Sequence, residues 1–351
     1  MHVTIWGRIR TPFNCLAGSI LPGGRIIMFT VIGTCTVDLF VSNLAGMPRS
    51  EGDEFTVDSL VFHDEPLRTS LGGNGANSAY ALARLGAAVE LVGGLGEDHL
   101  GDWMASQLED AGVGMGSVKR YPGTGTATTL ILSDREQNRL AFHHEGANRA
   151  VDGSSIGSSL VRGSDMLLLT SYSIMPGLRP YGAVEQFREA RQSGTRTAVD
   201  IGPAIGEPAH LEELRPLLAL TNYFICNEHE LAVCTGGVEL AAGMATILEC
   251  GAGCVVIKRG AEGAVVLERD GIAASSIGGP THVPGFPVEV QTTVGAGDSF
   301  NAGFLLAVQE GSTAEQAARF ANAVAATVVS TIDRPLDALS REVVSRLFGP
   351  S

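Results

Sequence analysis

Short apolar segments alternate with segments of helical periodicity along most of this chain, and this alternation constrains the fold more than any other feature. Buried strands are expected at 28–33, 89–92, 166–169, 197–199, 223–226, 254–257 and 264–267. Amphipathic helices are expected at 77–85, 180–193, 228–235, 298–309, 313–330 and 340–347. Because consecutive parallel strands need a crossover that is usually a helix, this order predicts an α/β fold with a mostly parallel sheet covered on both faces. Ligands of such sheets bind at the carboxyl ends of the strands.

The chain is expected to consist of one extension and one large domain. Its 351 residues, 44% of them hydrophobic, suffice for a sizeable core, and no change in composition marks a linker within 28–351. Residues 1–27 lack the continuous apolar stretch of a signal peptide, and we expect an N-terminal extension that is disordered or lies outside the native protein. Alternating apolar positions in 42–71 predict a small antiparallel β flap, a lid to which part of 120–145 contributes.

Charge and cysteine content exclude several classes of function. The net charge of −14 argues against a nucleic-acid partner, because duplex binding needs a basic face. No apolar stretch is long enough to span a membrane, so no membrane partner is expected. The six cysteines show no zinc-binding pattern and indicate reduced thiols, as in a cytoplasmic protein. The remaining partners are small molecules.

The most informative segment is Gly295-Ala296-Gly297-Asp298, which comes directly before an apolar helix. Glycines at this position let consecutive amide groups point into one concavity, and the helix dipole makes that concavity a site for phosphate oxygens. A carboxylate beside such a site cannot itself bind an anion, and a general base for an incoming hydroxyl explains its presence. The alternative is an ordinary helix cap, in which Asp298 or Ser299 caps the helix and the glycines form the turn.

A second glycine-rich segment, Gly72-Gly73-Asn74-Gly75-Ala76-Asn77, also runs into a helix. Its glycines allow the backbone to come close to a ligand, and the amides of Asn74 and Asn77 suit sugar hydroxyls because they both donate and accept. The alternative is a glycine turn in which Asn77 caps the helix.

Together the two segments resemble the signatures of the ribokinase-like, or PfkB, carbohydrate kinases. The first signature continues in 81–86 and 92–98, the second is 294–298, and the similarity covers about 28–348. The resemblance implies a three-layer αβα sandwich with a β lid, and an enzyme that transfers the γ-phosphate of ATP to a sugar hydroxyl. It makes Asp298 the base and Gly295, Ala296 and Gly297 the phosphate cradle.

The resemblance also implies roles for residues outside the cradle. Substrate-binding residues are expected at Asp38, Gly72, Gly73, Asn74 and Asn77. ATP-binding residues are expected at Asn227, Lys258, Gly260, Gly263 and Asn322, and Glu230 is expected to hold Mg²⁺ through water. Each has an ordinary structural alternative: an exposed turn for Asp38, a capping box for Asn227 and Glu230, a solvated loop at 258–263, and a surface position for Asn322.

Two departures from the family pattern bear on cofactors. Thr292 stands where the family usually has an aspartate linked to a monovalent-cation site, and the segment 330–335 lacks the usual glycine. Both speak against activation by K⁺, so ATP and Mg²⁺ are the expected cofactors. An exposed edge of the lid favours a homodimer.

Alternative functions remain open at this point. The segment 143–148 resembles sugar-specific members, which favours a ribose-, fructose- or ketodeoxygluconate-like acceptor. Asn74 stands where ribokinase-like sequences often have lysine, so a nucleoside (adenosine-like) kinase is the second possibility. A catalytically silent regulator that binds sugar or nucleotide is the third, although it would have no use for a base. A nicotinamide-dependent oxidoreductase is disfavoured, because no Gly-x-Gly-x-x-Gly follows the first strand.

Overall fold

The computed structural model describes residues 27–47, 63–136, 138–269, 279–332 and 334–348. Within them, nine strands form a main sheet in the order β13-β12-β11-β10-β9-β8-β1-β4-β5. Every neighbouring pair from β5 to β11 is parallel, whereas β12 and β13 are antiparallel. The predicted α/β class and mostly parallel sheet are therefore confirmed. The strands are β1 (Met28–Ile32), β4 (Ala88–Gly96), β5 (Val118–Tyr121), β8 (Met166–Leu169), β9 (Arg196–Asp200), β10 (Tyr223–Asn227), β11 (Cys254–Lys258), β12 (Ala264–Glu268) and β13 (Thr281–Val283).

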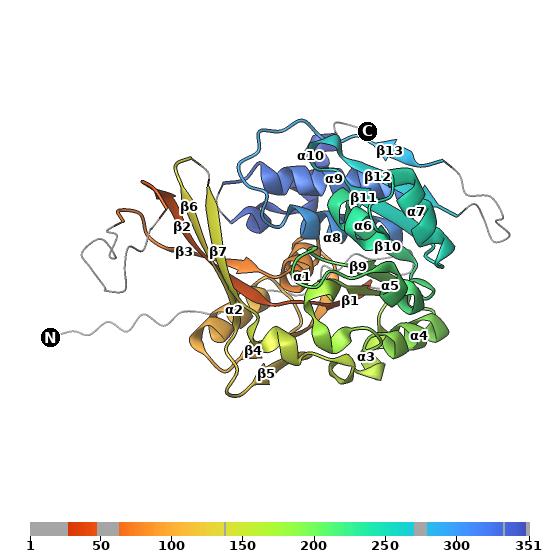
Figure 1. Cartoon of the computed structure of the whole chain (residues 1–351), viewed down its shortest axis with the longest axis horizontal. Coiled ribbons are helices and arrows are strands. Elements are labelled where there is room, and N and C mark those ends of the chain that lie inside the picture. The colour runs from red at the N-terminus through yellow and green to blue at the C-terminus, as the bar shows by residue number, and fades with distance from the viewer. Residues whose placement is uncertain (1–26, 48–62, 137, 270–278, 333, 349–351) are drawn as a thin grey trace.

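Helices cover both faces of this sheet and make the predicted three layers (Figure 1). One face packs against α1 (Asn74–Arg84), α2 (His99–Asp110), α8 (Ala296–Gln309), α9 (Ala314–Val329) and α10 (Arg341–Phe348). The other packs against α3 (Ser158–Gly163), α4 (Val184–Ser193), α5 (Leu211–Leu218), α6 (Glu228–Thr235) and α7 (Leu240–Glu249). Short 3₁₀ helices lie at Gly146–Ala150, Gly153–Ser155, Tyr172–Ile174, Pro176–Leu178, Gly260–Glu262 and Pro335–Ala338.

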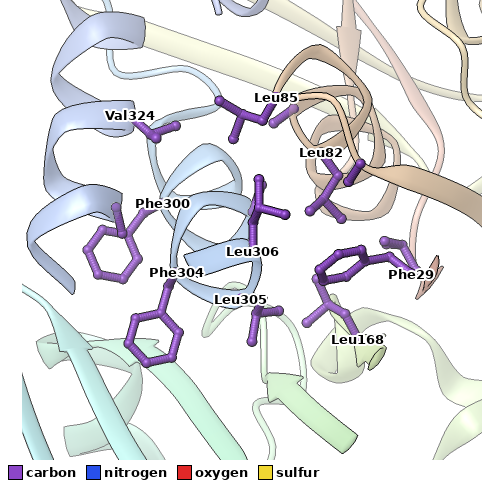
Figure 2. Packing of buried hydrophobic residues seen from close by; sticks show 14 of the residues in the cluster. Phe29, Leu82, Leu85, Leu168, Phe300, Phe304, Leu305, Leu306 and Val324 are labelled. Atoms are coloured by element: carbon purple, nitrogen blue, oxygen red, sulfur yellow. The ribbon is translucent and has the colours of Figure 1, made fainter. Parts of the chain in front are cut away.

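Alternating side chains of the strands divide the core into two clusters, one on each face of the sheet. Leu168 of β8 belongs to the first cluster and its neighbour Leu167 to the second, as expected for a strand buried on both sides. Figure 2 shows α8 between α1 and α9 in the first cluster, with Phe304 and Leu306 among the buried side chains. Burial of each such side chain stabilises the fold by about 1.5–3 kcal/mol. This packing fixes the position of the α8 N-terminus.

A second sheet stands to one side of the main body, in the order β3-β2-β6-β7 (Figure 1). Its strands are β2 (Thr36–Leu44), β3 (Arg68–Gly72), β6 (Ala127–Asp134) and β7 (Arg139–His144). The predicted lid at 42–71 with a contribution from 120–145 agrees with it in part, because 127–144 supplies β6 and β7, but the first strand starts at Thr36. Residues 48–62 lie outside the described residues. The sheet is also mixed rather than antiparallel, because β2 and β6 run parallel.

Several element boundaries differ from the prediction. The helix expected at 77–85 begins at Asn74, since Gly73, with φ 84°, is its N-cap and Asn77 lies inside the helix. The capping role that was the alternative for Asn77 is therefore wrong. Helices α2, α3, α5 and α7 were not predicted. The extension predicted at 1–27 lies outside the described residues except for Ile27, which is buried.

Within the described ranges, no single helix has the length and apolar character needed to cross a membrane. The bent pair α6 and α7 meets that test by length and composition when its members are taken together, with 63° between them.

Candidate active site

Close backbone packing brings the start of α1 to the carboxyl end of β1. A Cβ atom on Gly33 would lie 2.7 Å from the Cα atom of Gly75, and one on Gly73 would lie 2.5 Å from the carbonyl oxygen of Thr34. Gly73 also adopts a positive φ that other residues avoid. These glycines are therefore required by contacts within the protein itself. Their effect is to hold the first turn of α1 at the sheet edge where ligands bind.

Asp298 lies in the first turn of α8 and faces α1. The N-cap of α8 is Gly295 at φ 76°, so the helix-cap interpretation of Asp298 is wrong. Its Oδ1 accepts a hydrogen bond from Asn74 Nδ2 and its Oδ2 accepts one from Asn77 Nδ2, both at 2.9 Å. The residue is only 6% exposed, and burial raises the pKa of Asp298 to about 6, against the hydrogen bonds from Asn77 and Asn74. The structure thus brings the predicted base and both asparagines into direct contact.

The first turn of α8 holds the amides that were predicted to form a phosphate cradle. The first intrahelical bond of α8 runs from the amide of Ser299 to the carbonyl of Gly295, so the amides of Ala296, Gly297 and Asp298 precede it. Of these, the amide of Ala296 makes a long hydrogen bond to the carbonyl of Thr293 at 3.4 Å, whereas those of Gly297 and Asp298 have no backbone acceptor among the described residues. The helix of 14 residues contributes the positive end of its dipole at the same place. Anion binding is the chemistry that this arrangement favours.

Lys258 places a positive charge behind the cradle. A Cβ atom on Gly297 would lie 3.4 Å from Lys258 Nζ, so the ammonium group lies beside the glycine on the side where a side chain would project. Nζ donates to Asp200 Oδ2 at 2.7 Å and to Asn301 Oδ1 at 3.3 Å, and Asn301 Nδ2 donates to the same Asp200 oxygen at 2.5 Å. Burial opposes the charge on Lys258, but the carboxylates of Asp200 and Glu230 outweigh it and raise the pKa of the lysine.

Sequence reasoning missed Asp200 and Asn301. A usable signal was present for Asp200, since it is the last residue of β9, as Lys258 is the last residue of β11. Polar residues at the carboxyl ends of parallel strands meet at the ligand-binding edge. Asn301 lies one turn beyond the cradle glycines, directly before the apolar residues 302–308 of the same helix.

Asn227 and Glu230 form the capping box that was the structural alternative for them. The amide of Asn227 donates to Glu230 Oε2 and the amide of Glu230 donates to Asn227 Oδ1, both at 2.8 Å. Glu230 is nevertheless buried beside charged groups of the site. Burial, followed by the charge of Asp200, raises the pKa of Glu230 to about 7. Capping and a role at the site are compatible, because the capping bond uses one carboxylate oxygen.

The inner face of the second sheet carries a polar row in register. Ser70 lies opposite Asp38, Asp38 opposite Thr129, and Thr129 opposite His143. Directly opposed residues point to the same side of a sheet. Burial raises the pKa of Asp38 to about 6, against a hydrogen bond from Thr129, whose Oγ1 lies 3.1 Å from His143 Nδ1. Asp38 is therefore no exposed turn residue. A Cβ atom on Gly72 would lie 2.5 Å from the Asp38 carboxyl carbon, which places this carboxylate next to the α1 segment.

Two of the remaining predicted ATP-binding residues, Asn322 and Gly263, make structural contacts with the chain at 283–285. Asn322 is buried in α9 and donates to the carbonyls of Val283 and Pro284 at 3.1 Å, so the surface position that was its alternative is wrong. Gly263, at φ 91°, is required because a Cβ atom there would lie 2.6 Å from the carbonyl carbon of Pro284. Gly260 has a positive φ and open space around it.

Comparison with known proteins identifies the family. The model of the pfkB family of carbohydrate kinases matches residues 35–333. The ATP-dependent ribose-1-phosphate kinase of Halopiger xanaduensis is 31% identical over 259 residues, covering 74% of this chain and 80% of that protein. The ribokinase of Bacillus subtilis is 30% identical over 301 residues, covering 85% and 92%.

The fold agrees with that assignment. The solved structure of Arabidopsis thaliana ribokinase complexed with ribose and ATP matches with a TM-score of 0.76 at 23% identity, covering 93% of this chain and 99% of that one. The chain belongs to the pfkB family of carbohydrate kinases. The predicted ribokinase-like fold and enzyme class, a sugar kinase, are confirmed.

Proposed function

We propose that this protein transfers the γ-phosphate of ATP to a hydroxyl of a small sugar, with Asp298 as the general base. One observation carries the proposal: a buried carboxylate, oriented by two amide donors, lies in the first turn of the helix that forms the anion cradle. The names of the relatives, ribokinase and ribose-1-phosphate kinase, support ATP as donor and a pentose-like acceptor.

The acceptor hydroxyl gives its proton to Asp298 as its oxygen attacks the γ-phosphorus, and the bond from that phosphorus to the bridging oxygen of ADP breaks in line. The amides of Ala296 and Gly297 stabilise the charge on the equatorial oxygens, and Lys258 adds a fixed positive charge behind them. The base must be ionised, so activity is expected to fall as the pH drops below about 6, the pKa of Asp298.

Magnesium fits this site as a companion of the nucleotide. Among the described residues, no group of three or more His, Cys, Asp or Glu side chains could hold a metal ion. A Mg²⁺ ion that keeps its waters and binds phosphate oxygens needs only an outer carboxylate, and Glu230 is the residue that would orient those waters. The bound ion would neutralise charge on the phosphates.

The polar row of the second sheet is the proposed acceptor side. Ser70, Asp38 and Thr129 offer a carboxylate and two hydroxyls at neighbouring positions, which suits a polyol. The sheet would act as a lid that excludes water from the transferring phosphate. A carboxylate and two hydroxyls predominate in this row, and the imidazole of His143, whose Nδ1 lies 3.1 Å from Thr129 Oγ1, is its one aromatic ring. A sugar is therefore favoured over a nucleoside.

A coupled assay of ADP production tests the proposal. The acceptor panel contains ribose, ribose 1-phosphate, fructose, ketodeoxygluconate and adenosine, each with and without Mg²⁺ and K⁺. We expect ADP release with one sugar, dependence on Mg²⁺, and no requirement for K⁺, since the Thr292 hydroxyl accepts from the amide of Val294 where a cation-binding carboxylate is usual. Sugar binding without ADP release from any acceptor would favour the silent regulator instead.

We also propose a homodimer formed through the outer face of the lid. Phe142 and Leu140 of the edge strand β7 are 57% and 45% exposed, and their cross-strand partners are Leu130 and Leu132. Within the part of the chain that the structure describes, β7 pairs only with β6, and an apolar sheet edge of this kind suits contact with a second copy.

Light scattering tests the dimer. We expect the unmodified protein to be dimeric and Phe142→Glu to be monomeric, because the substitution puts a charge into the apolar contact. Val238→Glu makes the same change at a 43% exposed residue between α6 and α7 and should leave the mass unchanged. A monomeric parent protein, or a dimeric Phe142→Glu variant, would rule out this interface.

A further inference from the structure

The side chain of Asn74 points at the base rather than only lining an acceptor pocket. It occupies the first residue of α1, and its Nδ2 donates to Asp298 Oδ1 at 2.9 Å. An asparagine amide can also turn over, and the turned amide would present Oδ1 to the carboxylate. Two oxygens with no proton between them repel each other, and the base would lose its donor. Something must therefore hold the amide in the productive orientation.

A closed ring of hydrogen bonds supplies that restraint. The backbone amide of Asn74 donates to Thr34 Oγ1 at 3.2 Å, Thr34 Oγ1 lies 2.8 Å from Ser171 Oγ, and Ser171 Oγ donates to Asn74 Oδ1 at 3.1 Å. Each hydroxyl has one proton. Thr34 Oγ1 accepts from the backbone amide of Asn74, and among the described residues its other hydrogen-bond partner is Ser171 Oγ, so the proton of Thr34 is donated to Ser171. The proton of Ser171 then needs an acceptor, which Asn74 Oδ1 provides and a turned amide would not. Every direction around the ring is then fixed, and Nδ2 of Asn74 is left for Asp298.

The backbone of Ser171 adopts an unfavourable conformation, which the surrounding structure must stabilise. Ser171 is 0% exposed and adopts φ 60°, a left-handed conformation that serine rarely takes. A Cβ atom on Gly202 would lie 2.7 Å from the Cα atom of Ser171, and the amide of Gly202 donates to Asp200 Oδ1 at 2.8 Å. Asp200, which pairs with Lys258, therefore holds Gly202 in place, and Gly202 packs against the backbone of Ser171.

We propose that Asn74 is a positioning residue for Asp298, and that the hydroxyls of Thr34 and Ser171 hold its amide in the orientation that presents Nδ2 to the base. This inference rests on the proposed function for its meaning, since it concerns the base of that reaction. The stabilisation of the Asp298 carboxylate by an oriented donor changes the pKa of Asp298, and that pKa can be measured without any turnover.

The proposal predicts a change in the titration of Asp298. The charged groups that act on Asp298 from neighbouring elements are Asp200 of β9, Lys258 of β11 and Glu230 of α6. None of them is altered when Asn74 or Ser171 is substituted. Loss of a donor that stabilises the ionised form raises the pKa of a carboxyl. The acidic limb of kcat/KM should therefore move to higher pH.

The first test compares Asn74→Leu, Ser171→Ala and the double variant. We expect Asn74→Leu to move the acidic limb upward by about one to two pH units, the size of a hydrogen bond to a charged group. Ser171→Ala should give a smaller upward shift, because the amide is then free to turn. The double variant should shift no further than Asn74→Leu, since Ser171 acts only through Asn74.

Ser164→Ala is the matched control. Ser164 is a buried serine whose Oγ lies 2.6 Å from Thr30 Oγ1, so it bridges β1 and the flank of β8 as Ser171 does. It lies before β8, at the amino end of the strands, whereas Ser171 follows β8. This variant should show a similar loss of stability and no change in the pH profile.

A second measurement does not depend on catalysis. The proton uptake of each protein, minus that of its Asp298→Asn counterpart, titrates the Asp298 carboxyl directly. An Asp298 pKa that is unchanged in Asn74→Leu would overturn the inference, and additive shifts in the double variant would overturn the part assigned to Ser171. A chain that shows these shifts but transfers no phosphate would instead count against the proposed function.

Discussion

Asp298→Asn is expected to lower kcat by about two to four decades, the usual range for loss of a general base. The amide has the size of the carboxylate but cannot take a proton from the acceptor. It also meets two donors, Asn74 Nδ2 and Asn77 Nδ2, and can accept from only one of them. The KM for ATP should change less, because the cradle amides are unaffected. Steady-state kinetics of both proteins with the active acceptor give the comparison.

The pH profile and the stability of this variant separate catalysis from folding. The unmodified protein should lose kcat/KM below about pH 6, where the buried Asp298 takes up a proton. The residual activity of Asp298→Asn should lack that limb. Because the substitution removes a buried charge, its unfolding midpoint should be close to that of the parent protein. Near-normal turnover in a folded Asp298→Asn protein would remove this residue from the mechanism.

The fold was predictable because two signals agree along the chain. Apolar strands such as 166–169 and amphipathic helices such as 298–309 have different periods, and their alternation permits few architectures. The lid was predicted less well. Its strands β6 and β7 lie far along the chain from β2 and β3, and pairing between distant segments leaves little mark on local sequence.

The candidate site, too, was predictable from the sequence only in part. Glycines before a helix, and the aspartate that follows them, are local features, so the cradle and Asp298 could be predicted. The direction in which a side chain points is not local. Asn322 was expected beside ATP, and the structure shows its amide donating to the carbonyl of Val283; Asn77 was expected to bind substrate, and its amide donates to Asp298. Ser171 could not be predicted, because its role arises from contacts with Thr34 and Asn74.

Lys258→Met is expected to cost both stability and activity. Its side chain is 15% exposed and its partner Asp200 is 2% exposed, so the substitution leaves a buried carboxylate without its counter-ion. Breaking such a pair from one side typically destabilises a protein by about 3–5 kcal/mol. The variant also lacks the positive charge behind Gly297, and loss of one preorganised group of this kind costs about two to three decades in kcat. Chemical denaturation and turnover measure the two effects.

The double variant Lys258→Met/Asp200→Asn distinguishes the two roles of the lysine. Removing both charges relieves the uncompensated carboxylate, so most of the lost stability should return. Turnover should stay low, because nothing replaces the charge behind the cradle. If the double variant recovered turnover together with stability, Lys258 would be a structural residue and the phosphate would depend on the α8 amides alone. A single variant as stable as the parent would mean that water reaches Asp200 and that the site is less buried than its geometry implies.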